Sequence, residues 1–306
     1  PQGREQLSGW AGRAADVLHA QNNSGFTSMS ISLAGNNIFQ VGEQSQQFVI
    51  TRSGALSFSK ANSNQPAVHP LTLKNDALES MMDAHYDGLV QQAYADLTHN
   101  SIESGETFQT AFDGFDEATL TTAFPDNYLA SQLLGALKTI AVRQALGLRR
   151  QTIFVSFGGW DHHGELLETQ AGMLRVLSQS LAAFQAGLEE LGLAESVITY
   201  TSSDFGRTLR SNGRGTDHAW GGNQMVMGAP VQGGLVKGSF PDLALDGGND
   251  VGRGGRLLPS TSVDEFFGEM LRWFGVSAAD MPYVLPNFEN FHNPTDPTAP
   301  IGFVKP

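Results

Sequence analysis

The sequence predicts an α/β fold, in which helices flank a mostly parallel sheet. The first observation behind this prediction is a strand–helix–strand unit over residues 152–157, 165–191 and 197–201, because such a unit pairs its two strands in parallel. The second is the count of 35 glycines, which indicates many loops and tight turns rather than a helical bundle. The third is a length of 306 residues without a recognisable linker, from which we expect one domain over residues 1–306.

The N-terminal part predicts a helix followed by short strands. Apolar residues fall on one face of a helix over residues 1–20. Residues 28–34 alternate between polar and apolar side chains, which is the pattern of a half-buried strand. Two shorter strand-like runs, 48–51 and 55–58, follow between glycines and serines. We therefore expect an irregular, β-rich excursion from the sheet near the N-terminus.

The middle of the chain predicts two helices. Residues 75–98 and 127–147 have apolar side chains at helical spacing, and Gly147 ends the second helix as a C-terminal glycine commonly does. The first helix includes Asp83-Ala84-His85, whose carboxylate and imidazole would not share a helix face, so we expect a structural role for them. The polar segment 101–126 between the helices has no clear pattern.

The last third predicts a strand, a long loop and a helix. Residues 224–228 have the pattern of a strand, and the glycine-rich run 233–255 is typical of a loop. Ser262 and Glu265 have the spacing of a capping box, so we expect a final helix to begin there. The tail from Pro282 carries several prolines, and we expect it to be an extended surface segment.

Composition excludes several classes of function. A formal net charge of -13 disfavours nucleic acid and anionic membrane surfaces as partners. The absence of cysteine excludes thiol catalysis, iron–sulfur clusters and thiolate zinc sites. No stretch of about 18 apolar residues occurs, so the sequence predicts no transmembrane helix. A few arginines or a metal ion can still make one pocket of an acidic protein locally positive.

The first polar block is Gly158-Gly159-Trp160-Asp161-His162-His163-Gly164, directly after the strand over 152–157. Its glycines let the backbone turn sharply off the strand. Carboxylate oxygens and imidazole nitrogens are the usual ligands for zinc, manganese or iron. The alternative is a structural loop in which Asp161 caps the helix that begins near Gly164. We favour metal binding or catalysis, because several polar groups gather at a strand end.

The second polar block is Ser203-Asp204-Phe205-Gly206-Arg207-Thr208, which follows the strand over 197–201. Parallel strands meet at one edge of a sheet, so we expect Asp204 to approach Asp161. Arg207 suits bidentate binding of a phosphate or sulfate oxyanion. The alternative is an ion pair between Asp204 and Arg207 that orders the loop.

The third polar block is Gly215-Thr216-Asp217-His218-Ala219-Trp220-Gly221-Gly222. It places the imidazole of His218 among small residues just before a strand, with open space around it. Asp217 is suited to orient a histidine rather than to bind a metal ion itself. The alternative is a hydrogen-bonded turn without a chemical role.

Together the three blocks are similar to the bacterial family DUF1501. The similarity continues through Val231-Gln232-Gly233-Gly234, the helix 262–275 and Val284-Leu285-Pro286, and more weakly through residues 9–13. The resemblance implies a fold like that of the alkaline phosphatase and sulfatase superfamily, whose members use metal ions to hydrolyse or transfer phosphate and sulfate esters. It also implies twin-arginine export to the bacterial periplasm or the cell exterior.

The resemblance also implies roles for single residues. The implied ligands of a divalent metal ion (Zn, Mn, Mg or Ca) are Asp161, His163, Asp204 and His218. His162 becomes the variable middle residue of an Asp-x-His step, and the family more often has glutamate where Asp204 stands. The implied catalytic residues are Arg207, which would hold the oxyanion, and Asp217. The implied substrate is a small anionic ester or a sulfated or phosphorylated glycan.

The start of the chain differs from that of full-length family members. Those begin with an export signal and a strand that ends in a Gly-Gly-x-Asp-Gly-type turn, whereas this sequence starts at Pro1 after that point. Three explanations stay open: the segment was removed, it lies on a second chain or another copy, or the protein lacks it. We therefore expect either a metal-dependent hydrolase or a non-catalytic exported structural or surface-assembly protein that retains the fold.

Overall fold

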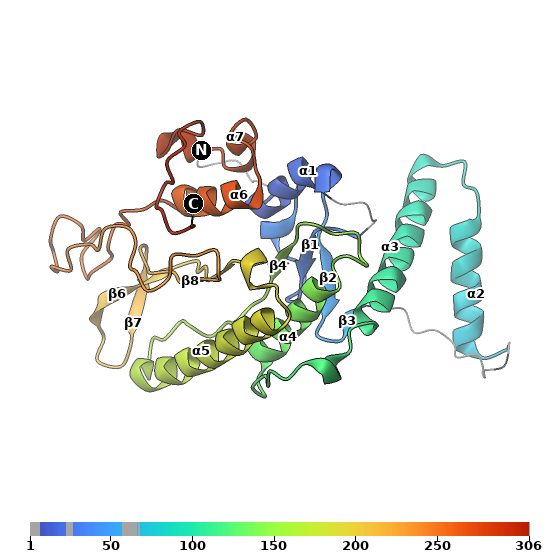
Figure 1. Ribbon diagram of the computed structural model, residues 1–306, viewed down its shortest axis with the longest axis horizontal. Helices are drawn as coiled ribbons and strands as arrows, with labels where there is room; N and C mark the ends of the chain where they lie inside the picture. Colours follow the sequence, from blue (N-terminus) through green and yellow to red (C-terminus); the bar gives the residue numbers. More distant parts are fainter. Residues whose placement is uncertain (1–6, 23–26, 57–65, 67, 306) are drawn as a thin grey trace.

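The segment with alternating polarity at 28–34 forms the middle of the sheet in the computed structural model, which describes residues 7–22, 27–56, 66 and 68–305. β1 (Ser30–Ser32) pairs in parallel with β2 (Phe48–Thr51) on one side and with β4 (Thr152–Phe154) on the other. β3 (Gly54–Ala55) pairs antiparallel with β2, so the order is β3-β2-β1-β4 (Figure 1). The prediction of a mixed α/β fold with a mostly parallel sheet is confirmed.

The parallel pairing predicted between the segments 152–157 and 197–201 is wrong. β5 (Thr199–Tyr200) pairs antiparallel with β8 (Val226–Met227) in a separate two-stranded sheet. The segments of β5 and β8 can approach this closely because residue 228 is a glycine. A β-carbon there would lie 2.4 Å from the carbonyl oxygen of Val197. A strand pattern indicates which residues are extended, but a strand of two residues contains too few side chains to specify its partner.

The core forms where the sheet meets the helices α1 (Trp10–Asn22), α4 (Tyr128–Ala141) and α5 (Leu166–Glu190). Asn127 caps α4, because its side chain accepts a hydrogen bond from the backbone N–H of Ala130 at 2.8 Å. The predicted helices 1–20, 127–147 and 165–191 thus exist with shifted ends. Residues 1–6 of the first, like residues 57 and 58 of the second strand-like run, lie outside the described part of the chain.

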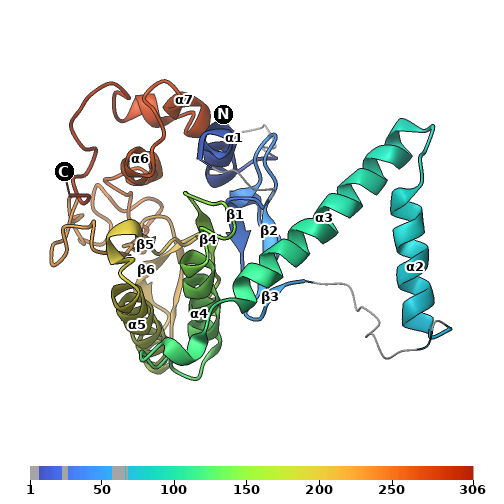
Figure 2. The same cartoon turned by 45° about the vertical axis from the view of Figure 1, so that its right-hand side comes forward.

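Two helices form an arm that projects from the body of the molecule (Figures 1 and 2). They are α2 (Pro70–Asp83) and α3 (Leu89–Asp113), so the single helix predicted over 75–98 is wrong, as is the placement of Asp83-Ala84-His85 within it. The backbone leaves the helix at Ala84, and the Tyr86 hydroxyl donates a hydrogen bond at 2.7 Å back to the carbonyl of Met81. Much of the unassigned segment 101–126 belongs to α3.

The C-terminal part begins with a hairpin of β6 (Gly206–Ser211) and β7 (Thr216–Ala219). A long loop leads from it to α6 (Val263–Phe274), where Ser262 and Glu265 form the predicted capping box. The expected surface tail from Pro282 is only partly present. α7 (Met281–Val284) and the Phe288 ring are buried in the core, whereas most of residues 289–299 are exposed. The buried Glu269 on α6 binds the tail through the backbone N–H groups of residues 301, 302 and 304.

Four short 3-10 turns complete the described elements: η1 (Ile38–Gln40), η2 (Glu117–Thr119), η3 (Ala194–Ser196) and η4 (Phe288–Asn290). Among the helices of the described residues, none has both the length and the apolar character needed to cross a membrane.

Candidate metal centre

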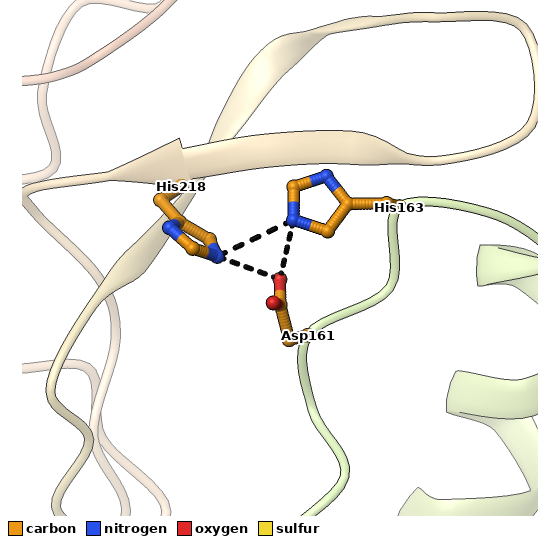
Figure 3. A group of neighbouring side chains, drawn as sticks. All are labelled: Asp161, His163 and His218. Atoms are coloured by element: carbon orange, nitrogen blue, oxygen red, sulfur yellow. Dashed lines mark hydrogen bonds and ion pairs between the residues drawn. The ribbon is translucent and has the colours of Figure 1, made fainter.

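Three side chains from two separate segments meet at one point (Figure 3). Asp161 and His163 lie in the loop that follows β4, and His218 lies on β7. The Asp161 Oδ1 atom is 2.9 Å from His163 Nε2 and 2.8 Å from His218 Nε2, and the two nitrogens are 3.4 Å apart. All three side chains are about half exposed, so the cluster opens to solvent. Within the described residues it is the group that offers a metal ion three ligand atoms.

The loop is held on the hairpin by backbone contacts. The Thr216 N–H donates to the carbonyl of His162 at 3.1 Å, and the Asn212 side chain donates to the carbonyl of His163 at 3.0 Å. Gly215 makes this approach possible, because a β-carbon there would lie 2.4 Å from the His162 carbonyl oxygen. Gly159, with φ of +98°, turns the chain after β4 toward the hairpin. The site therefore lies between the loop that follows the carboxyl end of β4 and the β6–β7 hairpin.

Arg207 joins the loop and the hairpin through a single guanidinium group. Its Nη1 donates to Asp161 Oδ1 at 2.5 Å, its Nη2 donates to the His162 carbonyl at 2.7 Å, and its Nε donates to Thr216 Oγ1 at 2.9 Å. Nη2 also donates to the Thr216 carbonyl. Because most of the five N–H donors of the group are used inside the protein, Arg207 fits a positioning role better than the predicted oxyanion contact. Its acidic partner is Asp161 and not Asp204.

The electrostatics of the cluster favour an ionised carboxylate. The hydrogen bond from His218, followed by the one from Arg207, lowers the pKa of Asp161 to about 2. A metal ligand must be in its deprotonated form, and Asp161 meets this condition throughout the physiological range.

The three ligand atoms fit a divalent ion. A circle through Asp161 Oδ1, His163 Nε2 and His218 Nε2 has a radius of about 1.8 Å. That radius is shorter than a bond of about 2.0–2.2 Å from zinc to nitrogen or oxygen, so one ion reaches all three atoms from one side of their plane. The 3.4 Å between the two nitrogens also matches the edge of a tetrahedron built on bonds of about 2.1 Å.

Two of the residues predicted for the site do not belong to the cluster of ligand atoms. Asp204 is exposed and does not belong to the group of ligand atoms. Its expected approach to Asp161 depended on parallel pairing of the preceding strands, which does not occur. Asp217 accepts a hydrogen bond from the backbone N–H of His218 at 2.9 Å, which lowers its pKa, and another from Arg256 at 3.0 Å. It thus contacts the His218 backbone rather than orienting an imidazole ring.

His162, between the two loop ligands, points into the protein instead. Its side chain is 6% exposed and packs near Trp160. Its Nε2 atom has no hydrogen-bond partner among the described residues. The assignment of His163 rather than His162 to the cluster therefore agrees with the geometry.

Sequence reasoning missed several residues around the cluster. The Phe205 ring packs on His218 with centroids 4.6 Å apart and so limits the rotation of that imidazole. A cavity of about 650 Å³ beside His163 is lined by Arg210, Arg253 and Arg256. The only available signal was the glycine-rich stretch around Arg253 and Arg256, which lacks the setting of a phosphate-binding loop.

These features define a mixed α/β protein with an exposed cluster of two imidazoles and one carboxylate. The model of the family described as "Protein of unknown function (DUF1501)" matches residues 1–283, and the chain belongs to this family. Neither the curated proteins nor the solved structures contain a significant match to the chain.

Proposed function

We propose that this protein is an exported, metal-dependent hydrolase of phosphate or sulfate esters with an alkaline-phosphatase-like fold. The observation that supports this function is the convergence of Asp161 Oδ1, His163 Nε2 and His218 Nε2 within 3.4 Å of one another at the solvent-exposed surface. Two imidazoles and one carboxylate with an open side are typical of catalytic metal sites, which keep a position free for water or substrate.

Each residue has a role in the proposed chemistry. Asp161, His163 and His218 would hold the ion, and a bound ion would supply a nucleophilic water at neutral pH and stabilise negative charge on the ester. Arg207 keeps Asp161 ionised and aimed at the two histidines. Phe205 and the hydrogen bonds to the carbonyls of His162 and His163 keep the imidazoles in place. Residues that contact the ligands of a metal ion, rather than the ion itself, commonly have this function.

The ligand set narrows the choice of metal ion. Mg²⁺ and Ca²⁺ prefer oxygen ligands, whereas imidazole suits zinc and other transition metals. Because two of the three atoms are imidazole nitrogens, we propose Zn²⁺ or Mn²⁺ rather than Mg²⁺ or Ca²⁺.

The second candidate is an exported assembly protein without catalysis, and the α2–α3 arm favours it. No described residue of α2 is buried, and Leu89, Val90 and Tyr94 on α3 are largely exposed. Such a surface suits a contact with a second chain or another copy.

Metal binding and turnover together separate the two candidates. The first measurement is zinc and manganese titration of chelator-treated protein by calorimetry, with His163→Ala and His218→Ala as site variants. His99→Ala, on the exposed face of the arm, is the matched control. We expect tight binding of about one ion, loss of binding in the site variants and no change in the control.

The second measurement is hydrolysis of 4-nitrophenyl phosphate and 4-nitrophenyl sulfate by the metal-loaded protein. Turnover that disappears in His218→Ala supports the hydrolase. Metal binding without turnover of either ester supports the assembly protein, and equal metal affinity in all variants rejects the site itself. Fractionation of cells that express the full-length gene tests the proposed export to the periplasm or the exterior.

A further inference from the structure

We propose that the cavity beside His163 is a subsite for a second anionic group of the substrate, which makes the substrate an ester with two negatively charged groups. The cavity is a hollow of about 650 Å³ that opens to solvent, and Arg210, Arg253 and Arg256 are among the residues that line it. The inference that the reacting ester binds at the metal cluster depends on the proposed function. The inference of an anion subsite depends on these arginines alone.

The cavity is a positively charged region on an acidic protein. The chain has a formal net charge of -13, yet the lining of the cavity combines Arg210, Arg253 and Arg256 with a single carboxylate, that of Asp217. Guanidinium groups bind phosphate, sulfate and carboxylate through paired hydrogen bonds. Concentrating them at one cavity attracts an anion there while the rest of the surface repels it.

The arginines keep donors free for such a ligand. No ion pair or hydrogen bond engages the side chain of Arg253 among the described residues. Arg210 has a long contact of 3.4 Å with Asp246, and both side chains are exposed, so the pair is weak. Arg256 uses one nitrogen for Asp217, at 3.0 Å, and another for the carbonyl of Arg253, at 2.9 Å. Asp217 offsets one of the positive charges, which leaves the lining with a positive balance.

The loop that carries Arg253 and Arg256 is built around Asp250. The Asp250 carboxylate accepts hydrogen bonds from the backbone N–H groups of residues 246, 255 and 256, at 2.8–2.9 Å. The same loop bonds to the edge of β6, where the N–H groups of Leu209 and Arg210 donate to the carbonyls of Gly255 and Gly254. These contacts place Arg253 and Arg210 on adjacent backbones at the cavity.

The backbone at Arg253 is strained. Residues 252–255 all have positive φ, and Arg253, at +71°, is the one residue among them that is not glycine. A left-handed conformation brings the β-carbon too close to the following carbonyl oxygen, so it is unfavourable for a residue other than glycine. Strain of this kind is typical of functional positions. An arginine at this strained position between glycines agrees with a role for its charge.

The cavity and the metal-type cluster share His163, which belongs to both. A ligand that reaches the cluster with one anionic group therefore meets the arginines with the next. Arg207, the arginine of the cluster itself, already donates to Asp161, His162 and Thr216. Arg210 and Arg253 are therefore the residues that bind the second anionic group of a ligand. Sulfated or phosphorylated sugars with more than one anionic group have this chemistry.

Calorimetric titration of the metal-free protein with pyrophosphate at about 0.15 M salt tests the subsite without the metal ion. We expect the affinity to fall about tenfold or more in Arg253→Gln and in Arg210→Gln, because each variant loses a charge-assisted hydrogen bond to the anion. Arg175→Gln, an exposed arginine on α5, removes the same charge at a distance and should leave the affinity unchanged. An equal loss in Arg175→Gln, or no loss in Arg253→Gln, would overturn the subsite.

A second titration tests the pairing of the two sites and compares glucose 6-phosphate with glucose 1,6-bisphosphate on zinc-loaded protein. We expect the bisphosphate to bind about tenfold more tightly, and Arg253→Gln to remove most of this preference. Equal affinities in the unmodified protein would contradict the two-anion substrate.

Failure of this inference and failure of the metal site give different results. His218→Ala should lose zinc and keep its pyrophosphate affinity, whereas Arg253→Gln should show the reverse. Unmodified protein that binds pyrophosphate but no zinc rejects the proposed function and keeps the anion subsite. Protein that binds zinc but shows no arginine-dependent pyrophosphate binding rejects the subsite alone.

Discussion

The guanidinium of Arg207 and the carboxylate of Asp161 lie 2.5 Å apart, and this ion pair connects the β6–β7 hairpin to the loop after β4. The same carboxylate oxygen faces His163 and His218. Arg207 therefore acts on the candidate metal centre without belonging to its ligand set. The pair also explains why two segments far apart in sequence present one common site.

Replacing Arg207 by lysine should weaken metal binding although the charge is kept. A lysine ammonium cannot bond to Asp161, His162 and Thr216 at the same time, so Asp161 and the loop lose their fixed position. Loss of a residue that hydrogen-bonds to a metal ligand typically lowers the metal affinity about 10–100-fold. Zinc titration by calorimetry measures this effect. Arg175→Lys is the control, and an unchanged affinity in Arg207→Lys would show that the pair does not position the ligand.

Replacing Gly215 by alanine should separate the loop from the hairpin. The new β-carbon would lie 2.4 Å from the His162 carbonyl oxygen and from the His163 carbonyl carbon, which are both backbone atoms. We expect a loss of about 1–3 kcal/mol in the free energy of unfolding, because the backbone must shift, together with weaker zinc binding. Denaturant unfolding measures the stability. Gly164→Ala is the matched control in the facing loop after β4, because its β-carbon would meet no atom within 4 Å.

The strain at Arg253 predicts a difference between two small replacements. Arg253→Gly should be more stable than Arg253→Ala by about 1 kcal/mol, because glycine adopts positive φ without a steric penalty. Both variants remove the guanidinium and should lose pyrophosphate affinity equally. Chemical denaturation compares the two proteins directly, and an alanine variant as stable as the glycine variant would contradict the strained conformation.

Glu190 predicts a pH dependence of stability. Hydrogen bonds from the backbone N–H of Thr121 and then the hydroxyl of Thr122 lower the pKa of Glu190 to about 2. A carboxylate with a lowered pKa stabilises the folded state in full above its ordinary value, and this contribution disappears as the pH falls toward the lowered one. Glu190→Gln should therefore be less stable than the unmodified protein at pH 7, and the gap should narrow between pH 4.5 and pH 2.

Urea unfolding at pH 7, 5 and 3 measures this gap. Glu195→Gln, an exposed glutamate near the end of the same helix, is the charge-matched control. A gap of the same size at all three values would show that the two threonines do not bind an ionised carboxylate.

Much of the candidate site was predictable from residue types. The Asp161-x-His163 step and His218 have the chemistry of metal ligands, and the structure brings these three side chains together. The sequence could not show that Asp204 lies outside this group of ligands. An aspartate after a strand has the same local pattern whether or not that strand joins the main sheet. The wrong partner assigned to β5 therefore misplaced one of the four predicted ligands.

The arginines of the cavity show the opposite case. Arg253 and Arg256 lie in a glycine-rich loop without a recognised motif, and Arg210 lies on a strand more than 40 residues earlier. These arginines line one cavity because backbone hydrogen bonds join the loop to the edge of β6 and because Asp250 accepts hydrogen bonds from three N–H groups of the loop. Nothing in the local pattern of either segment specifies this docking.

By itself, the sequence determined the elements whose interactions are local. The capping box of Ser262 and Glu265 and the extent of β2 depend on residues within a few positions of one another, so their pattern predicts them. Only the tertiary structure decided that β5 pairs with β8 and that Arg207 pairs with Asp161, 46 positions away, rather than with Asp204. The physical reason is that a contact between distant residues depends on the path of the whole intervening chain. That path follows from packing of the complete core, to which any one segment contributes only a part.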